Sequence, residues 1–262
     1  MTQNLDLLAE TASAVRAAGS ALLKRFGQAV RYETREELMA ALSANDAVAL
    51  AVLRPRLTAL RPEARWVEEE LEGGELPPGE WWVVDPVEGN INYLRGLPEW
   101  AVTATLVRDN QAVLTAVHVP LTGETYTALA GGGAAVDGRP LQVSATARLG
   151  LSLAATSYAR PDEEESVVQR IGASTTAMIR DALVVRTSVP ATLHLVNLAA
   201  GRLDVYWQLA SARADLLPGA LLVAEAGGTI SDVDGRGWTP VSEGFLATTP
   251  RVHAEAVASL SL

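Results

Sequence analysis

Carboxylates in three separate stretches of the sequence have the residue types and spacing of a magnesium site. Glu69 stands in a run of three glutamates, Asp85 and Glu88 are three residues apart, and Asp215 lies much further along the chain. Mg²⁺ prefers oxygen ligands in near-octahedral geometry, supplied by a few carboxylates, waters and a substrate phosphate. A turn after Asp85 would bring its carboxylate, that of Glu88 and the Val87 carbonyl to one ion.

Each stretch taken singly has an ordinary alternative. A run of glutamates is usually a solvated face, Asp-Pro is a common turn, and an aspartate at the start of a helix is usually its N-cap. The combination of the three stretches, in this order and spacing, is far more specific than any one of them.

Strand ends and a helix start are expected to position these side chains. Residues 65–69 and 81–85 are short extended runs, and the second ends abruptly at Asp85, which proline follows. Asp215 opens a helical pattern over residues 216–226. If a short helix begins after the 85–88 turn, Gly89 and Asn90 would offer backbone N–H groups to a phosphate.

The pattern of apolar and turn residues predicts two helices and a hairpin in the first part of the chain. Apolar spacing predicts helices over residues 4–26 and 45–60, and Pro55 is expected to kink or interrupt the second. Asp109-Asn110 is a hairpin signal between strands over residues 101–107 and 111–119.

Later segments alternate between strand and helix, which predicts two subdomains, 1–148 and 149–262. The further strands are expected over residues 124–129, 141–143, 151–157, 183–187 and 203–208, and the further helices over 162–180 and 190–200.

Composition excludes several classes of function. The chain has 262 residues, 48% of them hydrophobic, which is enough for a buried core. Because it has no cysteine, thiolate catalysis, disulfides and Cys-ligated zinc are excluded. A net charge of −10 argues against binding a nucleic-acid polymer. We find no signal peptide and no stretch approaching a membrane span, and expect a cytoplasmic protein with no membrane partner.

Two further features of the sequence have ordinary structural interpretations. The run from Gly131 to Gly133 lacks the Lys and Ser/Thr of a phosphate-binding Walker motif, so we interpret it as a turn. His118, His194 and His253 have no metal-ligand spacing among them.

The acidic motifs together resemble those of the inositol monophosphatase family, which includes fructose-1,6-bisphosphatases and nucleotide 3′-phosphatases. The resemblance covers nearly the whole chain. The segments that carry it are Asn45-Asp46, Glu69-Glu70, Asp85-Pro86-Val87-Glu88-Gly89, the stretch from Val119-Pro120 to Ser144, Ala200-Gly201-Arg202-Leu203-Asp204, Asp215 with Gly219, and Glu225-Ala226-Gly227-Gly228.

This resemblance implies a layered α-β-α-β-α sugar-phosphatase fold of α/β (α+β) class, usually dimeric, with two or three Mg²⁺ ions between its halves. It implies hydrolysis of a small phosphorylated substrate by a metal-activated water. By resemblance the catalytic residues are Glu69, Asp46 and Asn90; the metal ligands are Glu69, Asp85, Val87, Glu88 and Asp215; and the substrate contacts are Gly89, Asn90, Ala191, Gln208 and Asp215.

Among the positions that depart from the family pattern, three bear on the reaction or the substrate. Glu88 replaces an aspartate, which keeps the charge but changes its reach. Asn90 replaces a threonine whose hydroxyl helps align the attacking water, and an amide cannot relay a proton in the same way. Gln208 replaces a carboxylate that contacts inositol in true inositol monophosphatases. The resemblance therefore supports myo-inositol phosphate less strongly as the substrate.

The sequence therefore leaves two functions open. The first is a Mg²⁺-dependent phosphomonoesterase for a small phosphorylated polyol, sugar or nucleotide. The second is a catalytically impaired relative that binds a phosphorylated ligand or a partner without efficient turnover.

Overall fold

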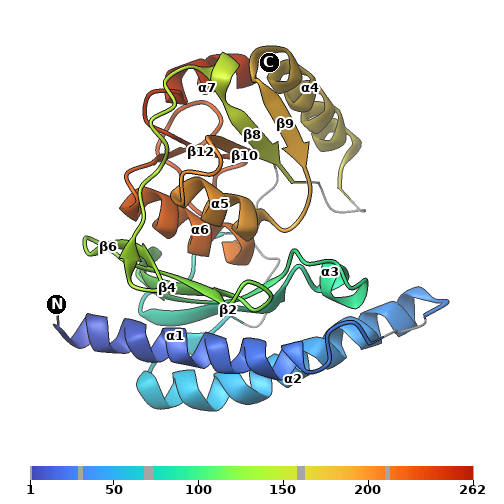
Figure 1. The fold of residues 1–262 in the computed structure, drawn as a ribbon, viewed down its shortest axis with the longest axis vertical. Coiled ribbons are helices and arrows are strands. Elements are labelled where there is room, and N and C mark those ends of the chain that lie inside the picture. Colours follow the sequence, from blue (N-terminus) through green and yellow to red (C-terminus); the bar gives the residue numbers. More distant parts are fainter. Residues whose placement is uncertain (1, 29–31, 68–73, 158–162, 210–212, 262) are drawn as a thin grey trace.

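Five layers of alternating helix and sheet make up the computed structural model (Figure 1). The structure describes residues 2–28, 32–67, 74–157, 163–209 and 213–261. A pair of helices covers one face of a seven-stranded sheet, a second pair separates that sheet from a five-stranded one, and two more helices cover the far side. The predicted layered α/β fold is confirmed.

The first sheet is a meander in which the strands follow their order in the chain. Neighbouring strands are antiparallel except for the first pair, which is parallel. Its strands are β1 (Arg65–Trp66), β2 (Glu80–Glu88), β3 (Ala101–Arg108), β4 (Gln111–Val119), β5 (Glu124–Leu129), β6 (Gly133–Val136) and β7 (Arg139–Pro140). Asp109 and Asn110 both have positive φ, 49° and 63°, as a tight hairpin turn requires, so the predicted hairpin is confirmed.

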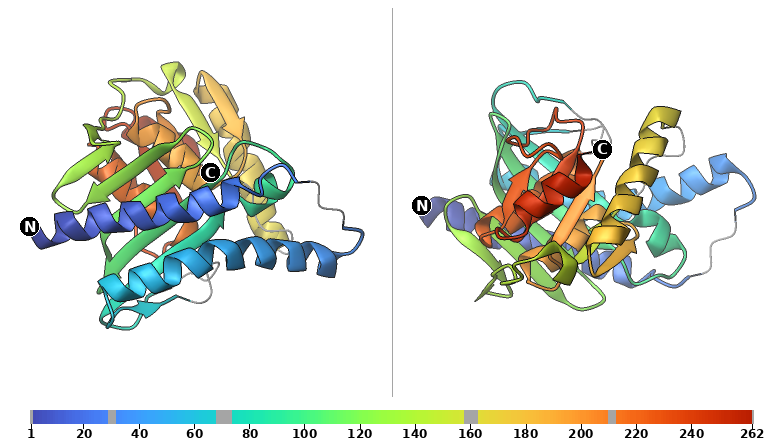
Figure 2. Two further views of the ribbon diagram at one scale, coloured as in Figure 1. Left: turned by 60° about the horizontal axis from the view of Figure 1, so that its bottom comes forward. Right: turned by 90° about the horizontal axis from the view of Figure 1, so that it is seen from above.

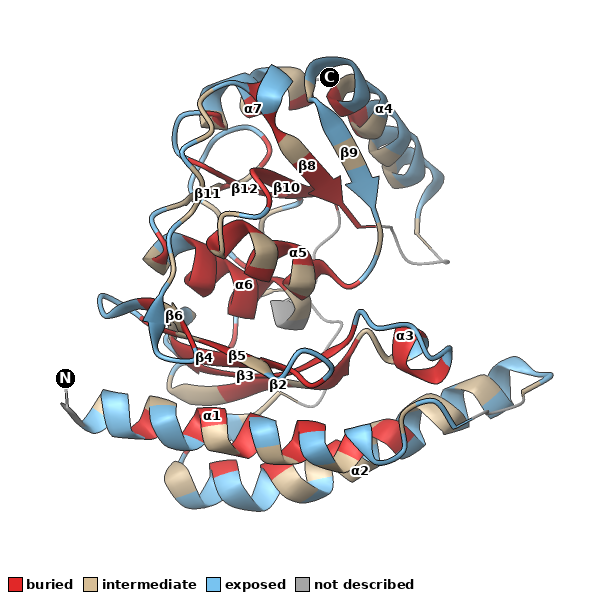
Figure 3. Cartoon of the chain, in the orientation of Figure 1, coloured by how far each residue is buried: buried red, intermediate tan, exposed pale blue. Residues whose placement is uncertain are grey.

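Helices α1 (Thr2–Leu23) and α2 (Arg35–Leu60) lie antiparallel across the outer face of this sheet (Figure 2). Apolar side chains from both helices join a buried cluster with Trp82 and Trp100 of the sheet side. The exposed colouring of the outer faces in Figure 3 shows that each helix buries one side only.

The expected start of α2 was wrong, and the helix is not interrupted at Pro55. The helix begins at Arg35 rather than near residue 45, because the Thr34 side chain accepts a hydrogen bond from Glu37 N and caps the first turn. Pro55 lies inside the helix, which continues to Leu60 without interruption.

By length and composition α2 could also cross a membrane, which corrects our expectation that no stretch approaches a span. A single helix of this kind is weak evidence for a membrane span, and α2 is packed against α1 and the first sheet.

The second sheet has the order β11-β12-β10-β8-β9. Its strands are β8 (Leu153–Thr156), β9 (Val184–Thr187), β10 (Val205–Gln208), β11 (Thr229–Ser231) and β12 (Phe245–Thr248). Strand β8 pairs in parallel with both β9 and β10, whereas β12 pairs antiparallel with β10 and β11. Residues 141–143, expected as a strand, lie outside both sheets.

The helices around the second sheet are α4 (Glu165–Asp181) and α7 (His253–Leu260) on its outer side, with α5 (Ala191–Ala199) and α6 (Arg213–Glu225) between the sheets (Figure 1). A short 3₁₀ turn, η1 (Leu149–Leu151), precedes β8. Helices α5 and α6 touch closely, since a Cβ added at Gly219 would lie 2.3 Å from the Leu195 Cβ.

Glu225, at the end of α6, holds the glycine run that precedes β6. Its two carboxylate oxygens accept hydrogen bonds from Gly131 N and Gly133 N, each at 2.8 Å. This run is therefore a turn, as expected. The contact ties the later part of the chain to the first sheet, and the proposed division at residue 148 stays a prediction.

Candidate metal centre

Three carboxylates from two distant segments of the chain meet between the two sheets. Asp85, Glu88 and Asp215 each offer an oxygen, and these atoms all lie within 4.8 Å of one another. Glu88 is only 2% exposed. The structure thus brings together three of the predicted metal ligands, while Glu69 lies outside the described residues.

A β-bulge aims the first two carboxylates. The pairing of β2 with β3 shifts register between Asp85 and Glu88, so two residues of β2 oppose one of β3. Asp85 Oδ1 accepts a hydrogen bond from Val87 N at 2.9 Å, which fixes its side chain over the bulge. We had expected the strand to end at Asp85, but it continues to Glu88, because Pro86 needs no ladder N–H within the bulge.

Gly89 makes the turn that follows. Its φ of 83° is in the left-handed region, and a Cβ there would lie 2.7 Å from the Glu99 carbonyl oxygen. The chain then enters the short helix α3 (Asn90–Leu94). The expected short helix is present, and it begins at Asn90.

Asp215 comes from the first turn of α6 rather than from its N-cap. The Thr192 hydroxyl, near the start of α5, donates a hydrogen bond to the Asp215 carbonyl oxygen at 2.8 Å. Thr192 is completely buried and also interacts with the Glu88 carboxyl. Sequence reasoning missed this residue, because no local pattern distinguishes it from other helical threonines.

Burial and mutual repulsion shift the protonation of these acids. Burial first, and then the charge of Asp215, raise the pKa of Asp85 to about 7. Burial and the charges of Asp215 and Asp85 raise the pKa of Glu88 well above its usual value. Without a cation, the cluster can reduce this repulsion only by holding protons.

Glu88 supplies an independent sign that a cation fits. Its Oε2 is buried and has no hydrogen-bond partner among the described residues. A buried carboxylate oxygen without a partner is costly, and coordination to a hard cation would satisfy it. Three oxygen donors of net negative charge are the ligand set that Mg²⁺ or a similar ion takes.

Asn90 connects this centre to α2. Its side-chain amide donates a hydrogen bond to Asp46 Oδ1 at 2.8 Å and another to the Leu42 carbonyl at 3.1 Å. Burial raises the pKa of Asp46 to about 6, and the bond from Asn90 opposes that rise. The predicted pair of Asp46 and Asn90 is therefore in direct contact.

Two of the residues expected to contact the substrate, Gln208 and Ala191, lie on the side of the second sheet. Gln208, at the end of β10, is 5% exposed and accepts a hydrogen bond from the Tyr206 hydroxyl. Ala191 is the buried first residue of α5. The Tyr206 pKa is raised, first by burial and partly by the charges of Asp215 and Glu88, which places β10 within electrostatic reach of the centre.

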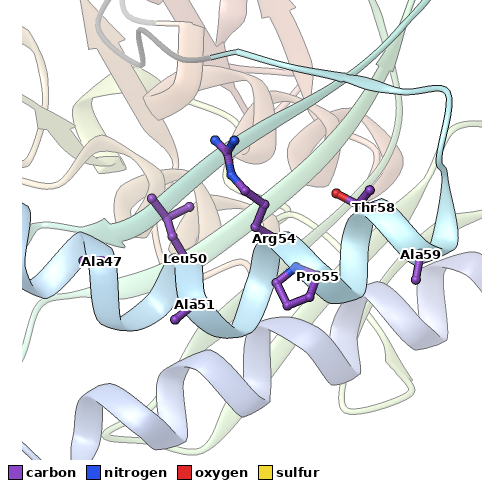
Figure 4. Close-up of a pocket in the computed structure, with 7 residues that line it drawn as sticks. All are labelled: Ala47, Leu50, Ala51, Arg54, Pro55, Thr58 and Ala59. Carbon is purple, nitrogen blue, oxygen red and sulfur yellow. The ribbon is translucent and has the colours of Figure 1, made fainter.

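A separate groove lies on the outer surface of α2 (Figure 4). It is lined mainly by apolar side chains, with Arg54 as its one charged residue and no carboxylate among its lining residues, which are Ala47, Leu50, Ala51, Arg54, Pro55, Thr58 and Ala59. It has no groups for cation or proton chemistry, so the carboxylate cluster is the candidate site.

Fold and site together define an α/β protein with a carboxylate centre, buried at Glu88, that is suited to a divalent cation. Comparison with known proteins gives the family. The model of the inositol monophosphatase family matches residues 4–261, so the chain belongs to this family. Membership supports a phosphatase, which is a hydrolase.

Individual relatives agree over most of their length. An inositol-1-monophosphatase of Rhizobium meliloti is 33% identical over 233 residues, covering 88% of this chain and 87% of the relative. A protein named Nus factor SuhB, from Pseudomonas aeruginosa, is 31% identical over 187 residues, covering 71% of this chain and 68% of the relative. The crystal structure of the extragenic suppressor protein suhB from Bartonella henselae superposes with a TM-score of 0.85 at 25% identity and covers 98% of both chains.

Proposed function

We propose that this protein is a Mg²⁺-dependent phosphomonoesterase that acts on a small phosphorylated polyol, sugar or nucleotide. The observation that carries the proposal is the cluster of Asp85, Glu88 and Asp215, in which Glu88 is buried and one of its oxygens has no partner among the described residues. Membership of the inositol monophosphatase family supplies the reaction class.

The three carboxylates would hold the cation, with the Val87 carbonyl and Glu69 as further ligands by resemblance. When bound, Mg²⁺ neutralises charge that grows on a phosphate and makes a water easier to deprotonate. The protein's own contribution is to hold three acids ready to coordinate, through the bulge at Asp85 and the Thr192 contact beneath Asp215.

Asp46 and Asn90 would act on the attacking water. The Asp46 carboxylate can accept a proton, and its pKa of about 6 is nearer to neutrality than that of an ordinary aspartate. Asn90 orients that carboxylate through a 2.8 Å hydrogen bond. The backbone N–H groups of Gly89 and Asn90 would bind the substrate phosphate, since the first N–H groups of a helix have no partner within it.

Gln208 bears on the choice of substrate. Its amide oxygen accepts from Tyr206, so the group that it presents differs from the acceptor-only carboxylate of enzymes that contact inositol. We therefore include sugar and nucleotide phosphates beside inositol phosphates as substrates, with Ala191 and Asp215 as the neighbouring contacts.

The test is phosphate release from a panel of inositol, sugar and nucleotide monophosphates with and without Mg²⁺. We expect turnover of at least one member that chelation abolishes and that Asp215→Asn removes, whereas Asp234→Asn, in an exposed loop, leaves it unchanged. No release from any member, with calorimetry still showing Mg²⁺ binding, would reject the enzyme in favour of a family member that binds without turnover.

We further propose a homodimer formed through the exposed apolar patch at the β9 edge. This β9 patch consists of Leu151, Ile179, Leu183 and Val184, which are 63%, 64%, 63% and 50% exposed. Strand β9 is an edge strand, and an apolar sheet edge is a template for pairing with a second copy. The cytoplasm stays the expected location.

A further inference from the structure

Asn45 touches the candidate active site through a second asparagine. Its side chain is 6% exposed, and its Nδ2 donates a hydrogen bond to Asn90 Oδ1 at 2.8 Å. Asn90 in turn donates from Nδ2 to Asp46 Oδ1 and to the Leu42 carbonyl. Two asparagines and one aspartate therefore form a chain of hydrogen bonds that links α2 to the first residue of α3.

The partners of Asn90 determine which way its amide faces. The Asp46 carboxylate and the Leu42 carbonyl are both acceptors, so the NH₂ group must face them. A flipped amide would place its oxygen against these two acceptors and its NH₂ against the Asn45 donor, which loses three hydrogen bonds.

This orientation limits what Asn90 can do in the site. Both of its amide hydrogens are used within the protein, and one lone pair of Oδ1 is used by Asn45. The group therefore retains acceptor capacity on Oδ1 and no free hydrogen. It can orient a water by accepting one of that water's hydrogens, while the neighbouring Asp46 is placed to take the proton.

We propose that Asn45 is a positioning residue that locks the Asn90 amide and, through it, the Asp46 carboxylate in the arrangement that receives the attacking water. The inference rests on the proposed function. A hydroxyl at position 90 could rotate to suit its neighbours, whereas an amide has two unlike ends and needs a donor on the oxygen side. Asn45 supplies that donor, since its Nδ2 hydrogen-bonds to Asn90 Oδ1.

The first measurement does not require turnover. In protein labelled with ¹⁵N, we expect the side-chain N–H₂ signals of Asn90 to exchange slowly with water, and Asn45→Ala to accelerate their exchange about five- to tenfold, the size expected for one lost hydrogen bond. The matched control is Asn197→Ala, which removes a half-buried amide that donates to Leu193 O within α5. This control should leave the Asn90 signals unchanged.

The second measurement is a double-mutant cycle on phosphate release. Asn45→Ala alone should lower kcat about three- to tenfold with KM nearly unchanged. In the Asn90→Thr background, the same change should alter kcat less than about twofold, because a hydroxyl has no fixed oxygen side to lock.

The two measurements separate the possible outcomes. An equal loss of kcat in both backgrounds, or unchanged Asn90 exchange in Asn45→Ala, would overturn the positioning role and leave Asn45 a packing residue. If no substrate turns over, the proposed function fails, and the exchange measurement alone still decides whether Asn45 locks Asn90. Thermal unfolding of both alanine variants checks that any change in kcat exceeds the effect of reduced stability.

Discussion

Asn90 donates a hydrogen bond from its side chain to Asp46 Oδ1 at 2.8 Å, and this contact joins the first residue of α3 to α2. The donor matters, because Asp46 is partly buried and its charge also acts on Asp85. Replacing this donor by an acceptor would leave two acceptors face to face.

Asn90→Asp tests this relationship with almost no change in size. At pH 8 both carboxylates are charged, and we expect a loss of about 1–3 kcal/mol in the free energy of unfolding together with most of the activity. At pH 5 one of the pair holds a proton that can donate, so the loss of stability should shrink. Denaturant titration at both pH values measures this, with Asn197→Asp as the control. A loss that is the same at pH 5 and pH 8 would contradict the prediction.

The raised pKa of Asp85 predicts how the cation-free protein responds to pH. The folded pKa of about 7 lies above the ordinary value of 3.8, so between these values the folded state holds a proton that the unfolded state has released. Stability due to this group is therefore present at about pH 4, falls as the pH rises, and is fully lost above about pH 7.

The variant Asp85→Asn isolates this effect. With a chelator present, we expect the variant to show a flatter dependence of unfolding free energy on pH than the unmodified protein between pH 4.5 and pH 8, and to be the more stable of the two above pH 7. Chemical denaturation at four pH values would measure it. If the two curves stay parallel, the Asp85 carboxyl does not titrate as the structure indicates.

Glu88→Gln should separate metal affinity from stability. The change replaces one carboxylate oxygen by an NH₂ group that can donate to the neighbouring acids and ends the repulsion that raises the Glu88 pKa, so the chelated protein should be as stable as before or more so. Binding of Mg²⁺ at 100 times its Kd stabilises a protein by about 2.7 kcal/mol, and this gain should largely disappear in the variant.

The matched control for Glu88→Gln is Glu243→Gln, because the Glu243 side chain is 89% exposed and its pairing with Arg170 is long, at 3.8 Å. Thermal unfolding with and without Mg²⁺, together with calorimetry, measures both variants. An undiminished Mg²⁺ response in Glu88→Gln would mean that Glu88 is no ligand.

Local patterns predicted the parts of this fold that have local causes. The Asp109-Asn110 turn was predictable, because both residues tolerate the positive φ that the hairpin needs. The spacing of Asp85 and Glu88 indicated a shared site, and the structure brings both to Asp215. The start of α2 had a signal that we did not use, since Thr34 and Glu37 form a capping pair three residues apart.

Other features depend on contacts between distant segments. The continuation of β2 past Pro86 needs the bulge against β3, and the sequence Asp-Pro alone indicated a strand end. Thr192 reaches Asp215 across 23 residues, and Asn45 reaches Asn90 across 45. Strands β11 and β12 and helix α7 are short and were not predicted. Periodicity cannot reveal such pairings, because each residue type is ordinary in its own segment.

Gly89 should tolerate no side chain, and Gly96 provides a matched control. Both have left-handed backbone, with φ of 83° and 71°, so alanine strains either position. A Cβ at Gly89 would also lie 2.7 Å from the Glu99 carbonyl oxygen, whereas nothing lies within 4 Å of one at Gly96. We expect Gly96→Ala to cost about 1 kcal/mol of stability and Gly89→Ala about 1–3 kcal/mol more.

Gly89→Ala should also reduce Mg²⁺ affinity, since the shifted turn carries Glu88. Denaturant titration and calorimetry of the two variants measure these effects. Equal losses of stability, with equal Mg²⁺ affinity, would show that the turn relaxes around the methyl group and does not constrain the site.

The β9 patch predicts the effect of a single charge on assembly. Leu183 N and Val184 N both hydrogen-bond to the Ser152 carbonyl, so Leu151 lies beside them, and Ile179 precedes them at the end of α4. Val184→Lys would place a cation in the middle of this apolar edge, where burying it against a second copy is costly. We expect the variant to be monomeric, with an unfolding temperature close to that of the unmodified protein at low concentration, because the side chain is half exposed in the monomer.

The control is Val241→Lys, at a valine that is 58% exposed in a loop outside the patch. Sedimentation equilibrium of both variants and the unmodified chain across a hundredfold range of concentration measures the assembly. In a pair of copies related by a twofold axis, one substitution enters the interface twice, so its effect is doubled. An unmodified chain that is monomeric throughout, or a Val184→Lys variant that still dimerises as tightly as Val241→Lys, would rule out this edge as the interface.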